Sequence, residues 1–233
     1  MNMLKFSKKE KAAGKRIYRK FIIEKKKNLK SPLMTFNRLY GLLDEAEKKL
    51  IKKALSVNPK DYGKNFTIFY GIKAVPKDLV TIKNQRYFSA ENKRFEKVKT
   101  QFLPRPTFEA FKKLKVAMNK DLGRTINVVS GYRSPAYQAL ILFIVLFENN
   151  WNIEKTLRRL TLPGCSEHGY APCQAMDVAP ERGIIKLEDF DRTKEYKWLL
   201  KNALRFGFRL SYPKRNKYGV MFEPWHWRYV KQK

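Results

Sequence analysis

The sequence predicts an α+β fold, in which a small antiparallel sheet is flanked by helices and preceded by a basic, mainly helical N-terminal extension. One observation is that the β-rich runs are short, as in residues 126–130 (INVVS). Another is that apolar residues recur at helical spacing in longer segments, such as residues 107–119 and 195–206. The third is the concentration of lysine in residues 1–72, where 16 Lys and 3 Arg face 6 acidic residues, a net charge of +13.

Length and composition bound the domain organisation and the partners. A chain of 233 residues with 43% hydrophobic residues can bury a substantial core, and we expect one main domain, residues 73–233, with residues 1–72 attached as a module. The net charge of +30 indicates an anionic partner, such as nucleic acid, a wall polymer of the teichoic acid kind or lipopolysaccharide. Charge does not choose among these partners, and the codon bias of an AT-rich genome also produces lysine-rich chains.

Two helices are expected in the N-terminal module. Residues 44–57 carry acids in the first turn and lysines later, which suits the helix dipole, and residues 8–27 have apolar residues on one side. Basic helices with interleaved aromatic residues can bind nucleic acid or an anionic membrane. More often such residues form a solvated face above a small core.

Neither an export signal nor a membrane span is predicted. The first 30 residues are crowded with Lys and Arg, so we expect a protein that is made in the cytoplasm and does not leave it by the usual secretory route. The most apolar stretch, residues 139–147 (ALILFIVLF), is shorter than the roughly 20 residues that a bilayer needs and should form a core helix. Because Cys165 and Cys173 are the two cysteines, the chain can form one disulfide at most.

The helices of the main domain carry local start and stop signals. Thr107 is the expected N-cap of the helix at residues 107–119. Pro135 should start the apolar helix that runs to residue 147, and Gly207 should end the helix at residues 195–206.

Short strands are expected at residues 67–72, 126–130, 220–222 and 225–230. The last two flank Pro224. Because Glu223 and His226 are three residues apart, they would point to opposite faces of an uninterrupted strand. We therefore predict a kink or bulge at Pro224 that turns both side chains to the same side.

Histidine is used sparingly, since His168 and His226 are the two in the chain. Asp177 follows the first by nine residues, and Glu223 precedes the second by three. A single histidine in a loop is usually structural or solvated. However, hydrolytic zinc takes three nitrogen or oxygen ligands and keeps a fourth position for water, so a His, Asp, His set with a further Glu is what a catalytic zinc needs. The predicted sheet is therefore expected to carry a zinc site.

Three motifs occur in order between residues 75 and 230. They are residues 130–134 (SGYRS) with Gln138, residues 166–177 (SEH to AMD) and residues 223–226 (EPWH). These motifs resemble the SGYRSxxxQ, SxHxxGxAxD and ExWH signatures of the VanY-type zinc D-alanyl-D-alanine carboxypeptidases, with the related D-Ala-D-Ala dipeptidases and phage-lysin peptidases. The family usually has seven steps from His to Asp where this chain has nine, and a two-residue insertion around residues 170–173 would explain the difference.

The resemblance implies a zinc metallopeptidase with one Zn²⁺ per chain, held by His168, Asp177 and His226. It also implies that Glu223 accepts the proton of the attacking water and later delivers it to the leaving amine.

Further residues of the motifs are implied to handle the substrate, the peptides of peptidoglycan. Arg133 would stabilise the oxyanion or anchor the substrate, and Gln138 and Ser166 would bind the peptide. We expect a D-alanyl-D-alanine carboxypeptidase, with a phage-type endopeptidase as the alternative. The basic surface would hold the enzyme against anionic envelope polymers at the periplasm or cell wall, after release or non-classical export.

A rival hypothesis from another class is a nucleic-acid-binding protein with a structural zinc. Cys165, His168 and Cys173 have knuckle-like spacing, and His226 would complete a closed site. The charge of +30 and the aromatic content would suit RNA or DNA. This hypothesis leaves Asp177 and the SGYRS motif unexplained, so nucleic acid is the less favoured partner.

Overall fold

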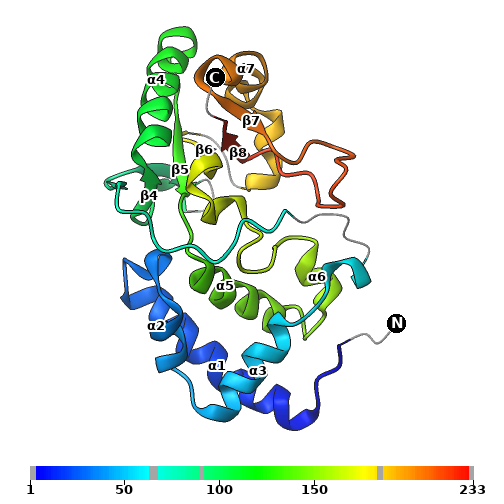
Figure 1. The fold of residues 1–233 in the computed structure, drawn as a ribbon. Coiled ribbons are helices and arrows are strands. Elements are labelled where there is room, and N and C mark those ends of the chain that lie inside the picture. The colour runs from blue at the N-terminus through cyan, green and yellow to red at the C-terminus, as the bar shows by residue number, and fades with distance from the viewer. Residues whose placement is uncertain (1–3, 63–67, 90–91, 183–185, 231–233) are drawn as a thin grey trace. The chain divides into compact units, whose positions relative to one another are not determined.

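The computed structural model describes residues 4–62, 68–89, 92–182 and 186–230, and it contains two compact units. The first unit is formed by residues 1–75, 133–169 and 215–221, and the second by residues 76–132, 170–214 and 222–233. Helices and short antiparallel strands make up the chain, so the predicted α+β class is confirmed (Figure 1).

The first unit is helical. Its helices are α1 (Lys8–Lys27), α2 (Phe36–Gly41), α3 (Glu45–Leu55), α5 (Pro135–Glu148) and α6 (Ile153–Leu157). The helices predicted at residues 8–27, 44–57 and 135–147 are confirmed as α1, α3 and α5.

Capping residues explain where these helices begin. Ser7 and Asp44 each start a helix with a capping box, in which the cap side chain accepts from the backbone three residues on and a glutamate at that position reaches back. The Ser134 side chain caps α5, whose first residue is Pro135.

Helix α5 is the centre of this unit's core. It packs against α1, α2, α3 and α6 (Figure 1). Most of its residues are buried, and Phe143 meets Phe21 of α1 edge to face with ring centroids 5.9 Å apart. The nine-residue apolar run is thus a core helix, as predicted, and among the described residues no helix is both long and apolar enough to cross a bilayer.

The N-terminal residues are also bonded to the start of α5. Ser134 donates its backbone N–H to the Pro32 carbonyl at 2.8 Å and its hydroxyl to the Met34 carbonyl at 2.6 Å. The boundary predicted between residues 72 and 73 stays a prediction. However, apolar residues between positions 4 and 62 share one hydrophobic core with α5, so removing residues 1–72 should expose the apolar surface of this helix.

Replacing Phe21 by alanine tests this shared core. Phe21 is fully buried, so Phe21→Ala should lower the free energy of unfolding by about 3 to 5 kcal/mol. Ile23, on the same helix but 52% exposed, is the matched control, and Ile23→Ala should change stability by less than about 1 kcal/mol. Thermal and urea unfolding would measure both. Equal, small effects would show that α1 is not part of the core.

The second unit is built around a four-stranded antiparallel sheet with the order β5-β6-β8-β7. Its strands are β5 (Ile126–Ser130), β6 (Ala175–Pro180), β7 (Phe208–Leu210) and β8 (His226–Tyr229). Helices α4 (Arg105–Leu122) and α7 (Lys194–Asn202) pack against each other, and α4 also contacts β1 and β4. Strand β5 is confirmed with the bounds that the sequence predicted.

Two further strand pairs precede α4. Strand β1 (Leu79–Ile82) pairs with β4 (Gln101–Pro104), and β2 (Arg86–Ser89) pairs with β3 (Arg94–Lys97), both antiparallel. These strands were not predicted from the sequence. Each is four residues long, and their sequences lack the regular alternation of apolar and polar residues that marks a half-buried strand.

Several predicted boundaries are wrong. Helix α4 begins at Arg105 after Pro104, so Thr107 is not its N-cap but a buried residue of its first turn. Residues 68–72 form no strand, because Gly71 has a φ of +93°; Thr67 lies outside the described residues. Residues 220–222 form no strand either, since they follow Gly219 with a φ of +66° and precede the turn at Pro224.

Candidate metal and catalytic site

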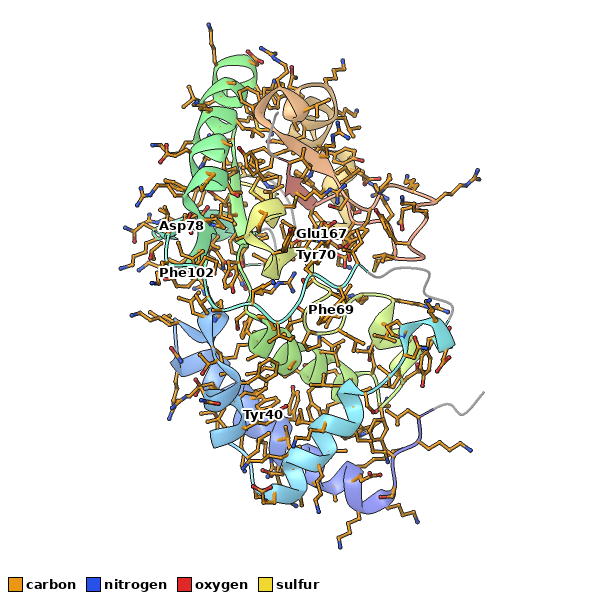
Figure 2. All side chains as sticks on the ribbon, viewed as in Figure 1. Tyr40, Phe69, Tyr70, Asp78, Phe102 and Glu167 are labelled. Atoms are coloured by element: carbon orange, nitrogen blue, oxygen red, sulfur yellow. The ribbon has the colours of Figure 1, made fainter. Side chains whose placement is uncertain are left out.

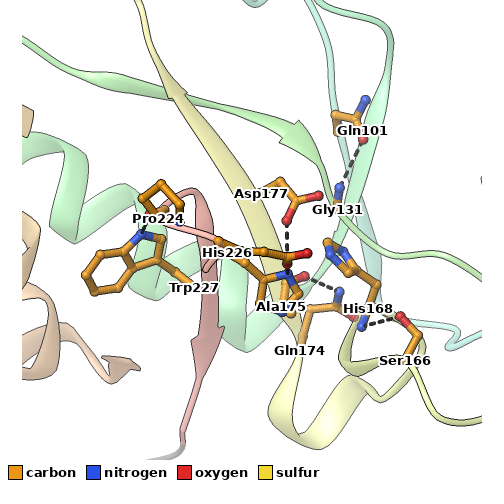
Figure 3. Close-up of polar contacts among 11 residues, drawn as sticks. Gln101, Gly131, Ser166, His168, Gln174, Ala175, Asp177, Pro224, His226 and Trp227 are labelled. Carbon is orange, nitrogen blue, oxygen red and sulfur yellow. Dashed lines mark hydrogen bonds and ion pairs between the residues drawn. The ribbon is translucent and has the colours of Figure 1, made fainter. Parts of the chain in front are cut away.

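Asp177 and His226 face each other on neighbouring strands. In the antiparallel pairing of β6 with β8, Asp177 lies directly opposite His226. Residues in such a pair project to the same side of the sheet. The His226 Nδ1 atom is 3.0 Å from the Asp177 Oδ1 atom (Figure 3). The strand register thus brings together two residues that are 49 positions apart in the chain.

A turn before β8 brings Glu223 to the same place. The His226 N–H donates to the Glu223 carbonyl at 3.1 Å. The Trp227 indole N–H donates to the Pro224 carbonyl at 2.9 Å (Figure 3). The predicted break at Pro224 is therefore confirmed. As a result, the Glu223 Oε2 atom lies 3.6 Å from His226 Nδ1, although three residues separate the two along the chain.

His168 lies in a single 3₁₀ turn, Glu167–Gly169. Its N–H donates to the Ser166 hydroxyl at 3.3 Å, and the Gly169 N–H donates to the Ser166 carbonyl at 3.0 Å. The His168 side chain is buried, with 1% of the residue exposed. Ser166 therefore orients the backbone from which His168 projects.

His168, Asp177 and His226 form a group that could hold a metal ion. Each offers one ligand atom, and these atoms all lie within 4.8 Å of one another. Asp177 lies within this distance of both histidines, although nine positions separate it from His168 in the sequence. The segment between His168 and Asp177 contains a second 3₁₀ turn, Ala171–Cys173, shortly before β6.

The donor set fits zinc. Two ligand atoms about 2.1 Å from one ion are at most about 4.2 Å apart, so small side-chain movements would bring all three onto a single Zn²⁺. Three nitrogen and oxygen ligands leave the fourth position that a catalytic zinc keeps for water or substrate. The metal-ligand group found among the described residues consists of two histidines and an aspartate, without a cysteine. Cys165 and Cys173 are free, and burial raises the pKa of the Cys165 thiol, which disfavours a thiolate ligand.

Arg133 is tied to the metal-site backbone. Its N–H donates to the His168 carbonyl at 3.0 Å. A Cβ atom at Gly169 would come within 3.0 Å of the Arg133 carbonyl oxygen, so glycine permits the close approach of the two chain segments. The SGYRS motif and the SEH motif are thereby joined directly, as a shared site requires.

Gln138 is placed less directly. It is 2% exposed, and its amide donates to the Thr161 carbonyl at 2.7 Å, which ties α5 to the loop before Ser166. Its role in binding substrate stays a prediction, as does that of Ser166.

Some residues around the site were not found from the sequence. The Tyr212 ring lies 4.8 Å from the His226 ring, and the Tyr212 carbonyl accepts from the Glu223 N–H at 3.1 Å. Gln101 accepts from the Gly131 N–H at 3.0 Å (Figure 3). A Cβ at Gly131 would come within 2.2 Å of the Phe102 carbonyl, so the glycine of SGYRS serves packing. No motif marked Tyr212 or Gln101, because their roles arise from strand and loop pairing.

Burial makes this cluster chemically unusual. His168, Glu223 and His226 are at most 7% exposed, and 13% of the Asp177 side chain is exposed. A buried Glu223 carboxylate and a largely buried Asp177 carboxylate beside two imidazoles are costly unless positive charge lies near them, which a metal ion would supply. A His, Asp, His group with a further glutamate beside it matches the donor set of a metal-dependent hydrolase.

The chain belongs to the VanY family. The family model described as "VanY: D-alanyl-D-alanine carboxypeptidase" matches residues 100–232, more than half of the chain. This range contains the SGYRS, SEH and EPWH motifs, so the resemblance read from the motifs is confirmed.

Individual relatives agree with the family. The chain is 34% identical over 145 residues to the putative carboxypeptidase YodJ of Bacillus subtilis, covering 59% of this chain and 50% of the relative. It is 32% identical over 118 residues to the bifunctional D-Ala-D-Ala dipeptidase and carboxypeptidase VanXYC of Enterococcus gallinarum, covering 47% and 58%. The chain thus spans about half the length of the curated relatives it matches. Among solved structures, the LD-carboxypeptidase LdcB is similar with a TM-score of 0.51 and 31% identity, over 66% of this chain and 69% of that one.

Proposed function

We propose that this chain is a zinc-dependent peptidase of peptidoglycan stem peptides and that it removes the terminal D-alanine as a D,D-carboxypeptidase. The observation that carries the proposal is the buried His168, Asp177 and His226 group with Glu223 beside it, in a chain of the VanY family. Two relatives support this substrate class, because VanXYC is named for its action on D-Ala-D-Ala and the structure of LdcB is described as revealing peptidoglycan recognition.

Three side chains would hold the ion. His168 and His226 would contribute imidazole nitrogens and Asp177 a carboxylate oxygen. A bound Zn²⁺ would supply Lewis-acid polarisation of the scissile carbonyl and a lowered pKa for water. Within the protein, the hydrogen bonds of Ser166 and the pairing of β6 with β8 keep these donors in place.

Glu223 is the proposed general base. It projects from the turn before β8, and its carboxylate is 3.6 Å from His226 Nδ1, close to the ligands without belonging to the metal-ligand group. The water oxygen would attack the carbonyl carbon while its proton passes to the Glu223 carboxylate. When the C–N bond breaks, Glu223 would return that proton to the departing amine, which yields a shortened peptide acid and free D-alanine.

Arg133 is the proposed anion binder of the site. A guanidinium offers several fixed donors, which suit either the C-terminal carboxylate of the peptide or the developing oxyanion. The bond between its backbone and His168 supports a position next to the reacting group.

A second candidate for the cleaved bond is the one that an L,D-carboxypeptidase hydrolyses. The similarity to LdcB, named an LD-carboxypeptidase, favours cleavage after the L-centre of a tetrapeptide. An endopeptidase of the same fold, as in phage lysins, is the third.

Mass spectrometry of defined muropeptides distinguishes these activities. We expect a zinc-loaded sample to shorten a pentapeptide stem ending in D-Ala-D-Ala by one alanine and to leave the tetrapeptide intact. Shortening of the tetrapeptide would instead assign an L,D-carboxypeptidase, and release of the whole stem an endopeptidase. No cleavage of any muropeptide would contradict the proposal. The Glu223→Gln protein, treated identically, controls for contaminating hydrolases.

The basic surface is the proposed means of attachment to the envelope. The chain carries 51 Lys and Arg against 21 Asp and Glu, and anionic wall polymers would attract it at low salt. We propose that it acts at the periplasm or cell wall. Cosedimentation with purified anionic walls should fall steeply as salt is raised, and salt-independent binding would refute an electrostatic attachment.

A further inference from the structure

A pocket lies in the second unit, lined by none of the proposed metal or catalytic residues. Its volume is about 380 Å³, within the range of small-molecule sites. The lining comprises the connection between β1 and β2 (residues 82–86), one face of α4, Asn127 of β5 and Glu181 after β6.

The pocket is at the opposite end of β5 and β6 from the metal ligands. In the pairing of these strands, Ser130 lies opposite Asp177, whereas Ile126 lies opposite Pro180. Glu181 lies four positions after Asp177, which corresponds to about 13 Å of extended chain. The pocket is therefore a separate site.

The walls of the pocket are held firmly. The Gln85 amide donates to the Val128 carbonyl at 2.9 Å, and its oxygen accepts from the Val128 N–H at 2.8 Å. Gln85 thus pins the β1–β2 connection to β5 in the way a paired strand would. The helical wall is equally regular, because Phe108, Phe111 and Lys115 recur at i, i+3 and i+7 on one face of α4.

The charge of the pocket is unbalanced. Four cations line it, from Lys83, Arg86, Lys112 and Lys115, against the single carboxylate of Glu181, a net charge of +3. Of these cations, Lys112 pairs with Glu109 outside the pocket at 3.2 Å.

Among these cations, Lys115 is the one that an anionic ligand would stabilise most. Burial lowers the pKa of its ammonium group, an effect that the Glu181 carboxylate only partly opposes. Within the described part of the chain, the Lys115 ammonium has no hydrogen bond and no ion pair; its recorded contact is with the face of the Phe111 ring, 5.8 Å from the centroid. An incoming anion would compensate for the hydration that this group has lost.

We propose that this pocket binds a phosphate group, carried by a small polyol or sugar, with Lys115 as the central ligand and Lys83 and Arg86 at the rim. A phosphate ester carries one or two negative charges and three or four acceptor oxygens, which matches several lysine and arginine donors converging on one volume. The half-buried Phe108 ring supplies an apolar wall for the carbon skeleton.

Binding measurements with a charge-neutral variant test the site. Isothermal titration calorimetry of the full chain at constant ionic strength would use inorganic phosphate, glycerol 3-phosphate and poly(glycerol phosphate). Lys115→Met keeps most of the side-chain volume and removes the charge, and it should weaken glycerol 3-phosphate at least tenfold. Lys113→Met, an exposed neighbour on α4 outside the pocket, should stay within twofold of the unchanged protein.

The three probes identify the source of the phosphate. Tighter binding of the polymer than of the monoester assigns a phosphodiester chain, and the reverse order assigns a free phosphorylated metabolite. If Lys115→Met proves poorly folded by thermal unfolding, the double variant Lys83→Gln with Arg86→Gln provides the same comparison at exposed positions. Binding that is absent, or that Lys113→Met weakens as much as Lys115→Met, would overturn the proposal. Because the readout is binding, the result does not depend on peptidase activity.

Discussion

Replacing either histidine of the buried group by alanine should abolish stoichiometric zinc binding and reduce peptide hydrolysis to the level of the metal-free protein. His168 and His226 each supply one of three donors, and two remaining ligands hold Zn²⁺ far more weakly than three. Asp177→Ala should behave in the same way. This variant is the most demanding of the three, because the nine-residue separation from His168 departs from the family spacing.

Metal content by mass spectrometry, after dialysis against a weak chelator, would measure this loss. The unchanged protein should retain about one zinc per chain and lose it together with activity when a strong chelator is added. A variant that keeps stoichiometric zinc would remove that residue from the ligand set. Circular dichroism would test whether the variants remain folded, since the sheet should persist without the ion.

Glu223→Gln should leave zinc in place and lower kcat by at least about 10²-fold, the scale of a positioned acid or base. Glutamine keeps the shape of the side chain and its capacity to hydrogen-bond, but it cannot take a proton from water. KM should change little, because the substrate contacts assigned to Arg133 remain.

Steady-state kinetics on the shortest cleaved muropeptide, with zinc measured on the same sample, would separate the possible outcomes. Normal turnover would exclude Glu223 as the base. Loss of zinc would make Glu223 a ligand and leave Asp177 without a role. Glu109→Gln, which removes a surface carboxylate on α4 that pairs with Lys112, is the control and should be indistinguishable from the unchanged protein.

Local sequence signals located the longer helices, because the causes of these helices are local, whereas the short helices α2 and α6 were not predicted. Pro135 lies at the first turn of the helix that it begins, and the acids and lysines of residues 44–57 suit the dipole of their own helix. One of the errors arose where contacts between distant segments determine the conformation. Residues 220–222 have strand composition, yet the chain there turns so that Glu223 bonds to Tyr212.

The core of the first unit could not be read from the sequence for the same reason. Residues 1–72 are strongly basic and looked separable. Their apolar residues nonetheless pack against α5, as Phe21 does against Phe143. Figure 2 shows the side chains that fill this unit. The charged residues of a segment show only that its helices have solvated faces. Which element the buried faces of those helices pack against depends on the tertiary structure.

By itself the sequence determined the chemistry of the site: two histidines, two acids and an arginine in three ordered motifs restrict the donor set and the reaction class. Only the tertiary structure decided how those residues meet. The pairing of β6 with β8 places Asp177 opposite His226, and the turn at Pro224 brings Glu223 next to His226. The hydrogen bonds of Gln85 to β5 help to form a pocket that no sequence motif indicated. The physical reason is that residue types carry charge and ligand preference locally, while distances between side chains depend on strand register and packing, which many distant contacts set together.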